Sequence, residues 1–379
     1  MTTQTQLADV AIVGAGIVGL AHALAAARRG LRVVVFEQHT HAVGASVQNF
    51  GLVWPIGQPA GHLHNRAMRS RAIWLEVCQQ AHLWYAASGS LHLLYHADEE
   101  AVALEYLETS AESHTLGRTM LTPAEVSAKS PAVQAEGLRS ALWSPTEINV
   151  DPRQAIRTLP QWLAAAYGVQ FQFGTAVQAI HAPYLETAAG QWQADQIIVC
   201  SGTHFESLYP ALYAASGLQR CKLQMLRTAP QPAGWQLGAA LCAGLTLLHY
   251  GAFRHCTSLA PLRERFQAEL PFYLEEGIHV LLSQTSLGEL TIGDHHEYAW
   301  SHDPFSRENV DAAILAYLQR FAVLPQPTIA ERWVGIYPIL RGQSELVLHP
   351  AAGVTIVNGL GGAGMTLSFG LAEEIVAAL

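Results

Sequence analysis

The chain has 379 residues; half of them are hydrophobic, 13% are charged, and the formal net charge at pH 7 is −9. This length allows two domains or one elaborated domain with a large core. The acidic balance argues against nucleic acid as the main partner, because binding to phosphate backbones requires a basic face. A small anionic substrate is still possible, since a few arginines can line a pocket in an acidic protein.

The five cysteines, at positions 78, 200, 221, 242 and 256, are scattered and form no C-x-x-C pair. This pattern argues against a disulfide framework and a zinc site, and no metal ligand is expected. A reducing cytoplasm fits the cysteine usage. No stretch is long and apolar enough to span a bilayer, so we expect a cytoplasmic protein without a membrane partner.

A βα unit is predicted near the N-terminus. The apolar run Val10 to Val13 has the length of a strand, Gly14, Gly16 and Gly19 follow in G-x-G-x-x-G spacing, and an Ala/Leu-rich helical run comes next. The first glycine allows a tight turn, the second lets the backbone approach a pyrophosphate, and the third lets the helix pack against the strand. The helix N-terminus offers N–H groups and partial positive charge to phosphates.

A second strand, Val33 to Phe36, ends on Glu37, which lies 23 positions after Gly14. An acid at this spacing can accept hydrogen bonds from a ribose diol. Strand, turn, helix, strand and acid occur in the order that a dinucleotide site requires. We therefore interpret the stretch as such a site rather than as a glycine-rich turn without a ligand.

The middle of the chain predicts a loop followed by mixed helices and strands. The stretch after Glu37 is rich in Gly, Ser, Asn, Gln and Pro, which predicts a long loop over a ligand. Thr122 to Glu125 predicts a capped helix start, with Pro in the first turn. The other predicted elements are helices at 64–80, up to 167 and at 309–321, and strands at 90–96, 169–173, 191–200, 223–227, 279–282 and 289–292.

The C-terminus repeats the N-terminal pattern. A strand, Gly353 to Val357, leads into a glycine loop and then a closing helix, Met365 to Leu379. A nicotinamide enzyme needs only the first glycine turn. A flavin explains the second, because reduction places negative charge at its N1–C2=O edge and a helix N-terminus stabilises that charge. The alternative is a C-terminal helix with a flexible glycine start.

Strand–helix alternation at both ends with a strand-rich middle predicts an α/β nucleotide domain, whose sheet is completed by distant segments, plus an inserted β-rich domain. The chain resembles the D-amino acid oxidase superfamily of FAD-dependent oxidoreductases, nearest its glycine oxidase and sarcosine oxidase branch. The segments that carry the resemblance are VGAGIVGL with Glu37, 44–46, 49–51, 150–152, 194–202, 291–294, 332–335 and 359–367.

The resemblance implies a Rossmann-like FAD-binding domain, at residues 1–85, 145–215 and 325–379, and an inserted α+β substrate domain, at 86–144 and 216–324, built on a large, mainly antiparallel sheet. The first glycine turn and Glu37 would bind the ADP half, and the later loops would follow the flavin ring. The implied FAD-binding residues are Val13, Gly14, Gly16, Ile17, Val18, Gly19, Glu37, Gln38, Ala45, Ser46, Asn49, Gly51, Val177, Ser201, Gly202, Gly335, Gly361, Gly362, Ala363, Gly364, Met365 and Thr366.

The family reaction is oxidation of a C–N bond: a neutral amine gives a hydride to flavin N5, the imine hydrolyses to an aldehyde or keto product, and dioxygen is reduced to hydrogen peroxide. No dedicated general base is implied. The alternatives left open are a glycine, sarcosine or D-amino acid oxidase, a quinone-linked flavin dehydrogenase, and a non-catalytic flavoprotein.

The chain departs from the family at its substrate clamp. Tyr337 stands where the glycine oxidase type has an arginine that pairs with the substrate carboxylate, and Thr366 stands where the sarcosine oxidase type has a lysine. Gly335 replaces the cysteine that tethers flavin in the sarcosine type, so the FAD is expected to be non-covalent. An ordinary α-amino acid substrate becomes less favoured.

Another group must then hold an anionic substrate. The segment 49–71 offers Gln58, His62, His64, Arg66, Arg69 and Arg71, and Arg341 follows Tyr337. Arginine donates in pairs to carboxylate or phosphonate. The segment also resembles a subgroup linked to aminophosphonate degradation, which implies 2-aminoethylphosphonate or an N-methylated relative. The candidate catalytic residues are Tyr337, Arg341, His62 and Arg66; the alternatives are a solvated helix face and ordinary loop histidines.

Overall fold

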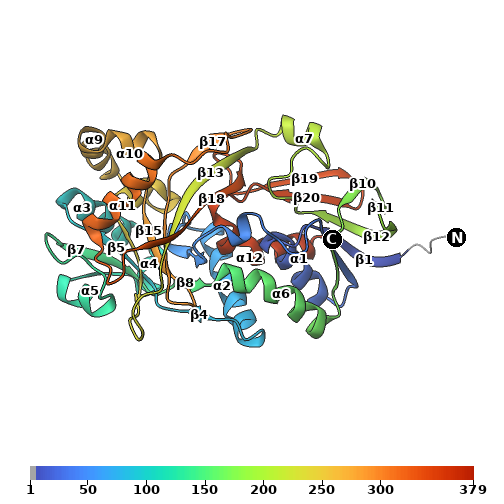
Figure 1. The fold of residues 1–379 in the computed structure, drawn as a ribbon, viewed down its shortest axis with the longest axis horizontal. Helices are drawn as coiled ribbons and strands as arrows, with labels where there is room; N and C mark the ends of the chain where they lie inside the picture. Colours follow the sequence, from blue (N-terminus) through green and yellow to red (C-terminus); the bar gives the residue numbers. More distant parts are fainter. Residues whose placement is uncertain (1–5) are drawn as a thin grey trace.

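The computed structural model describes residues 6–379, which form two large sheets with helices around them (Figure 1). The first sheet is parallel from β12 through β1 and β2 to β9, and antiparallel pairs occur at β10–β11–β12 and at β19–β20. Its strands, in spatial order, are β10 (Val177–His181), β11 (Tyr184–Thr187), β12 (Gly190–Val199), β1 (Gln6–Val13), β2 (Val33–Glu37) and β9 (Gln170–Phe173), with β20 (Val354–Asn358) on β12 and β19 (Leu346–Ala351) on β20.

Four helices pack together against this first sheet. The Ala-rich α1 (Ile17–Arg28) is almost wholly buried, because it contacts α12 (Gly364–Ala377) and α6 (Pro152–Tyr167) as well as the sheet. The fourth, α2 (His62–Gln80), packs on α12. Segments from both ends of the chain and from its middle therefore share one core. This arrangement brings the two glycine turns together.

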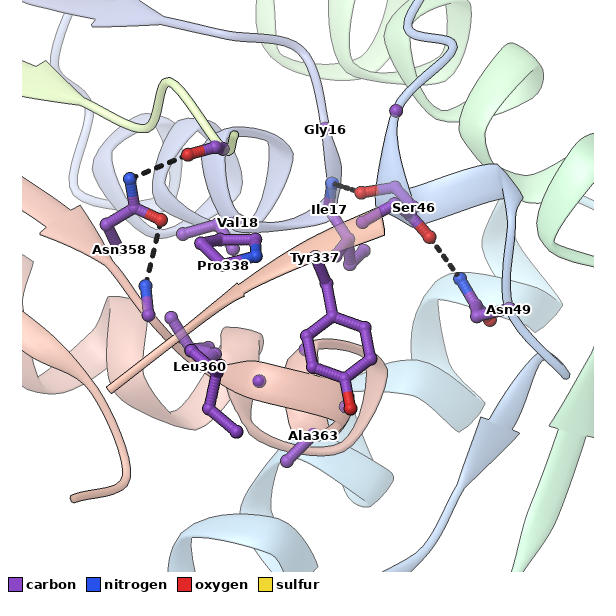
Figure 2. A pocket seen from close by; sticks show the side chains of 18 of the residues that line it. Gly16, Ile17, Val18, Ser46, Asn49, Tyr337, Pro338, Asn358, Leu360 and Ala363 are labelled. Carbon is purple, nitrogen blue, oxygen red and sulfur yellow. Dashed lines mark hydrogen bonds between the residues drawn. The ribbon is translucent and has the colours of Figure 1, made fainter. Parts of the chain in front are cut away.

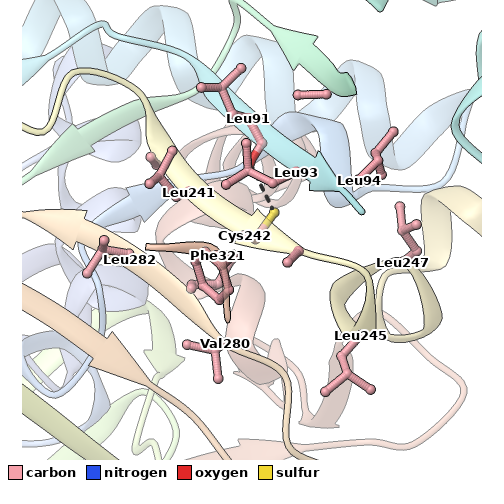
Figure 3. Close-up of a cluster of buried hydrophobic side chains, with 14 of the residues drawn as sticks. Leu91, Leu93, Leu94, Leu241, Cys242, Leu245, Leu247, Val280, Leu282 and Phe321 are labelled. Atoms are coloured by element: carbon pink, nitrogen blue, oxygen red, sulfur yellow. Dashed lines mark hydrogen bonds between the residues drawn. The ribbon is translucent and has the colours of Figure 1, made fainter. Parts of the chain in front are cut away.

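The second sheet is larger and mainly antiparallel, with β14 and β5 as a parallel exception. Its strands, in order, are β17 (Glu297–Ala299), β13 (Gln219–Thr228), β16 (Leu290–Gly293), β15 (Leu281–Gln284), β14 (Ala240–Ala243), β5 (Ser90–Leu94), β7 (Ser140–Ser144) and β6 (Thr119–Leu121), with β18 (Ile329–Ile339) on β13. Leu91, Leu93, Leu241, Leu282 and Phe321 are fully buried beside it (Figure 3).

The remaining elements surround these sheets. A small sheet of β3 (Leu52–Val53), β8 (Ile148–Val150) and β4 (Tyr85–Ala86) lies between the glycine-turn helices and the second sheet. The other helices are α3 (Ala97–Thr109), α4 (Ala111–Thr115), α5 (Pro123–Lys129), α7 (Pro210–Ala215), α8 (Leu245–His249), α9 (Leu259–Glu269), α10 (Pro271–Glu275) and α11 (Glu308–Phe321), and the 3-10 turns are η1 (Ala45–Val47), η2 (Pro55–Gly57), η3 (Gly251–Phe253) and η4 (Gly361–Ala363).

This architecture confirms the predicted α/β class with a Rossmann-like sheet and a large, mainly antiparallel sheet. The capped start at Thr122 is confirmed, since the Glu125 carboxylate accepts the Thr122 N–H at 2.8 Å. The strand expected at 90–96 ends at Leu94, because His96 is the N-cap of α3. The expected strand 279–282 begins two residues later, at Leu281.

One long strand, β18, joins the two expected discontinuous domains. β18 falls inside the third expected FAD-binding segment, yet it pairs with β13 of the second sheet along its whole length, from Gln219 opposite Ile339 to Thr228 opposite Ile329. No helix of residues 6–379 is long and apolar enough to cross a membrane.

Candidate active site

A cavity of about 780 Å³ runs from the two glycine turns of the first sheet to the face of the second sheet. Backbone of the glycine turns forms one end, and side chains of the second sheet and its loops form the other. We call these the cofactor end and the substrate end.

The cofactor end begins at the turn between β1 and α1. Gly14 has φ +104, and a Cβ built on it would lie 2.4 Å from the Cys200 carbonyl oxygen. A Cβ on Gly16 would lie 3.0 Å from the Ser46 hydroxyl, which accepts the Ile17 N–H at 2.9 Å (Figure 2). The first turn of α1 carries no acidic residue and no side-chain cap, so its remaining N–H groups suit an anionic ligand.

Glu37 closes the side of this turn. It is the last residue of β2 and is buried, and its carboxylate accepts the N–H of Ala15 at 3.1 Å and of His39 at 3.0 Å. These bonds hold the carboxylate beside the turn, where a ribose would follow the pyrophosphate. Val177 lines the same wall.

The second glycine turn lies next to the first, since a Cβ on Gly364 would lie 3.8 Å from the Ile17 side chain. Asn358 ends β20; its amide donates to the Gly202 carbonyl at 2.9 Å and accepts the Gly359 N–H at 2.8 Å (Figure 2). A Cβ on Gly359, which has φ +73, would lie 2.8 Å from the Leu218 side chain. Like α1, helix α12 starts here without an acidic residue or a side-chain cap.

The loop after β2 joins the two ends. η1 is fixed by Asn49, whose amide donates to the Ala45 carbonyl at 2.9 Å (Figure 2). Gln48 reaches across to β18: its carbonyl accepts the indole N–H of Trp333 at 3.1 Å, and its side chain accepts the Ile336 N–H at 3.2 Å.

At the substrate end, Tyr337 of β18 points toward the second glycine turn, and a Cβ on Gly362 would lie 3.6 Å from its hydroxyl (Figure 2). Burial, together with Cys221 and Asp294 nearby, raises the pKa of Tyr337 well above its ordinary value, so the hydroxyl stays protonated. Arg341 lines the cavity and lies 4.9 Å from the ring centre of Tyr298.

Comparison with known families decides the class of ligand. The family model described as DAO, FAD dependent oxidoreductase, matches residues 9–378. The chain belongs to this family of FAD-dependent oxidoreductases. Two helix N-termini and two crowded glycine turns around one cavity fit the two ends of FAD.

Individual relatives are more distant. The tRNA 5-methylaminomethyl-2-thiouridine biosynthesis bifunctional protein of Magnetococcus marinus is 27% identical over 65% of this chain and 28% of its own length. N-methyl-L-tryptophan oxidase of Escherichia coli K12 is 26% identical over 54% of this chain and 56% of its own length, so the chain spans less than two thirds of both. The crystal structure of glycine oxidase from Geobacillus kaustophilus is similar in fold, with a TM-score of 0.75 at 21% identity, over 99% of this chain and 95% of that one.

Most of the residues expected to bind FAD line the cavity, and two do not. Gly19 lies behind the first turn, where a Cβ would meet the Gly14 carbonyl oxygen at 1.9 Å, so it serves helix packing. Gly51 lies against β8, where a Cβ would meet the Val150 carbonyl oxygen at 1.9 Å. Thr366 lines the cavity, and its hydroxyl accepts the Trp54 N–H at 2.9 Å, which fixes the neighbouring loop.

Two expected catalytic residues, His62 and Arg66, lie outside the cavity. The expectation that they belong to the substrate site is therefore wrong. The guanidinium of Arg66 is buried and bonds to Glu374 at 2.6 Å and Glu345 at 2.8 Å. His62 is exposed, 3.5 Å from Glu374, and Arg69 pairs with the same carboxylate. His62, Arg66 and Arg69 are spaced so that they lie on one face of α2. This face contacts α12, so none of the three side chains reaches the cavity.

The remaining candidates of segment 49–71 divide in the same way. His64 bonds to the Arg118 guanidinium at 2.8 Å, and Arg71 donates to the Thr146 carbonyl at 2.5 Å, so both are used within the fold. Gln58 does line the cavity. The sequence reasoning missed a group of residues that line the substrate end, and of these only Asp294 lies in a segment that carries the family resemblance: His249, Tyr250, Arg254, His279, Asp294, His296 and Tyr298.

Proposed function

We propose that the protein oxidises a C–N bond of a small amine that carries an anionic group, with 2-aminoethylphosphonate or its N-methyl derivative as the substrate. The observation that carries the proposal is a pair of arginines, Arg254 and Arg341, at the substrate end of the cavity. Within residues 6–379, neither guanidinium has a carboxylate partner within 4.0 Å. Each can therefore donate paired hydrogen bonds to a phosphonate or carboxylate.

The usual clamps for an α-amino acid carboxylate are absent, which supports a substrate with its anion elsewhere. Tyr337 offers one neutral hydroxyl in place of a guanidinium, and the hydroxyl of Thr366 is already bonded to the Trp54 N–H. A phosphonate separated from the amine by two carbons would let the amine lie over the cofactor while the anion reaches an arginine.

FAD, held by the two glycine turns and Glu37, would supply the acceptor for a hydride from the carbon beside nitrogen. The resulting imine would be hydrolysed by water, and dioxygen would be the final acceptor and would be reduced to hydrogen peroxide. The protein orients the substrate through Tyr337 and the arginines. Gly335 supports non-covalent attachment: it has no nucleophile, and a Cβ there would lie 3.1 Å from the Gln48 carbonyl oxygen.

The names of the relatives support an amine substrate, since glycine oxidase and N-methyl-L-tryptophan oxidase both oxidise amines. The test is anaerobic bleaching of the flavin by a panel of glycine, sarcosine, D-alanine, 2-aminoethylphosphonate and its N-methyl derivative. Fast bleaching by the phosphonates alone is expected. Fast bleaching by glycine or sarcosine would overturn the substrate assignment, and flavin reduction without oxygen uptake in steady state would replace dioxygen by another acceptor, such as a quinone.

A further inference from the structure

Three histidines meet in the wall of the substrate end, although they lie 30 and 17 positions apart in the sequence. His249 is the last residue of α8, His279 precedes β15, and His296 follows β16. Each can present one ring nitrogen such that the three atoms lie within 4.8 Å of one another. The ring centres of His249 and His279 are 3.7 Å apart, and those of His279 and His296 are 5.1 Å apart. We call these residues the histidine cluster.

Hydrogen bonds hold two of the three histidines in place. His296 Nδ1 lies 2.9 Å from the Gly277 carbonyl oxygen, so this nitrogen donates to the carbonyl and Nε2 is the nitrogen that remains for a ligand. A backbone carbonyl that accepts from the second ring nitrogen is the usual support of a metal-ligating histidine. His279 is positioned by backbone bonds to Asp294 in both directions, at 3.2 and 2.9 Å.

A buried carboxylate completes the surroundings. Asp294 is 4% exposed, and its Oδ1 lies 3.5 Å from His279 Nε2 and 4.0 Å from His296 Nδ1. Among the described residues, neither this oxygen nor His279 Nδ1 has a hydrogen-bond partner. Nε2 of His279 lies on the side of the carboxylate, and Nδ1 remains for a ligand.

The chemistry of the cluster favours a cation over an anion. A lone anion would face the Asp294 carboxylate in a site of low dielectric, where like charges repel strongly. Neutral imidazoles beside a carboxylate are instead a common donor set for divalent transition metals.

We propose that His249, His279 and His296 bind one divalent transition metal ion, such as Zn²⁺, with Asp294 as the supporting carboxylate. Three histidines leave a fourth coordination position. Because the cluster lines the cavity, this position would face the substrate end, where water or a group of the substrate can occupy it. The proposal concerns a binding site and holds whichever amine the enzyme oxidises.

The test measures metal binding to the FAD-loaded enzyme, purified without a polyhistidine tag and treated with a chelator that is then removed. Equilibrium dialysis against Zn²⁺ with elemental analysis is expected to give one ion per chain. The Cu²⁺-loaded enzyme is expected to give an electron paramagnetic resonance signal with coupling to imidazole nitrogens. His279→Ala and His249→Gln are each expected to weaken Zn²⁺ binding by about tenfold or more.

The matched control is His181→Ala, because His181 is exposed at the end of β10 in the first sheet. This variant is expected to bind Zn²⁺ as the unaltered enzyme does. FAD content and thermal midpoint are measured for every variant, and His249→Gln, at a half-buried helix end, is the gentler change if His279→Ala fails to fold. Absence of stoichiometric Zn²⁺ binding, or equal loss in the control, would overturn the proposal.

Discussion

The two ends of the cavity differ in the groups that line them: mainly backbone at the cofactor end and side chains at the substrate end. The cofactor end is made mainly of backbone: two glycine turns, two helix N-termini and the loop after β2, with the Glu37 carboxylate beside them. The substrate end is made of side chains that reach inward from separate strands and loops of the second sheet. A backbone site excludes added side chains, whereas a side-chain site can change its ligand one residue at a time, so substitutions at the two ends should fail in different ways.

The largest effect is expected from Gly14→Val. The added Cβ would lie 2.4 Å from the Cys200 carbonyl oxygen, on a residue with φ +104, so the turn must distort. We expect FAD to bind at least about 100-fold more weakly, measured as FAD content and by titration of the apoprotein. Gly174→Ala is the control: its φ is +65, but nothing lies within 4 Å of the added atom, so only a stability loss of about 1 kcal/mol is expected, with FAD content unchanged.

A second test asks whether the arginines of α2 stabilise the fold and do not bind the substrate. Arg66→Met should lower the free energy of unfolding by about 3 kcal/mol, because it leaves the partly buried carboxylates of Glu345 and Glu374 without their main partner. Arg69→Met, at a more exposed guanidinium that pairs with the same Glu374, should cost less than about 1 kcal/mol. Urea unfolding measures both. A change in substrate preference without loss of stability in Arg66→Met would return this residue to the active site.

The same ion pair gives a pH dependence. Burial alone would raise the pKa of Glu374, but hydrogen bonds and charge from Arg66 outweigh it and hold this pKa below its ordinary 4.5. The stabilisation is therefore fully present above pH 4.5 and is lost as the pH falls through the lower pKa of the folded state. The difference in unfolding free energy between the unaltered enzyme and Arg66→Met should shrink below pH 4.5. If this difference in unfolding free energy stays constant down to pH 3, the ion pair with Glu374 is not the source of the stabilisation.

Tyr337→Phe should affect the substrate end alone. It removes one hydroxyl that faces the second glycine turn and leaves the ring in place. We expect kcat/KM to fall by about tenfold, from the loss of one hydrogen bond to the substrate, with FAD content unchanged. Loss of FAD with unaltered kinetics per bound flavin would assign the hydroxyl to the cofactor end instead.

The smallest and most selective effect is expected from Arg341→Ala. The KM for a phosphonate-bearing amine should rise by about tenfold, because one charged hydrogen-bond donor is lost. An uncharged amine of similar length should show little change. Arg320→Ala, in α11 and outside the cavity lining, is the control and should leave both KM values unchanged. Equal changes for both amines in Arg341→Ala would remove this arginine from anion binding.

The sequence predicted the cofactor end because contiguous motifs build it. Gly14, Gly16 and Glu37 fall within one βα unit, and their spacing alone predicts where the backbone turns. The fold class followed from the same units and the alternation around them.

The substrate end could not be predicted in the same way. Arg66 was a reasonable candidate by residue type, but its partners Glu345 and Glu374 lie 279 and 308 positions away. Nothing local indicates that they meet it. His249, His279 and His296 are likewise brought together only by the pairing of the second sheet and the end of α8.

Strand β18 connects the cofactor end of the cavity to the substrate end. It pairs with β13 along its length, donates two hydrogen bonds to Gln48 from Trp333 and Ile336, and forms a bridge to the second glycine turn between Ile339 and Leu360. The strand cannot separate from the second sheet without also loosening the loops around FAD. Amide hydrogens of this strand should therefore exchange with solvent as one cooperative unit, and loading with FAD should slow that exchange far beyond the residues that the cofactor touches.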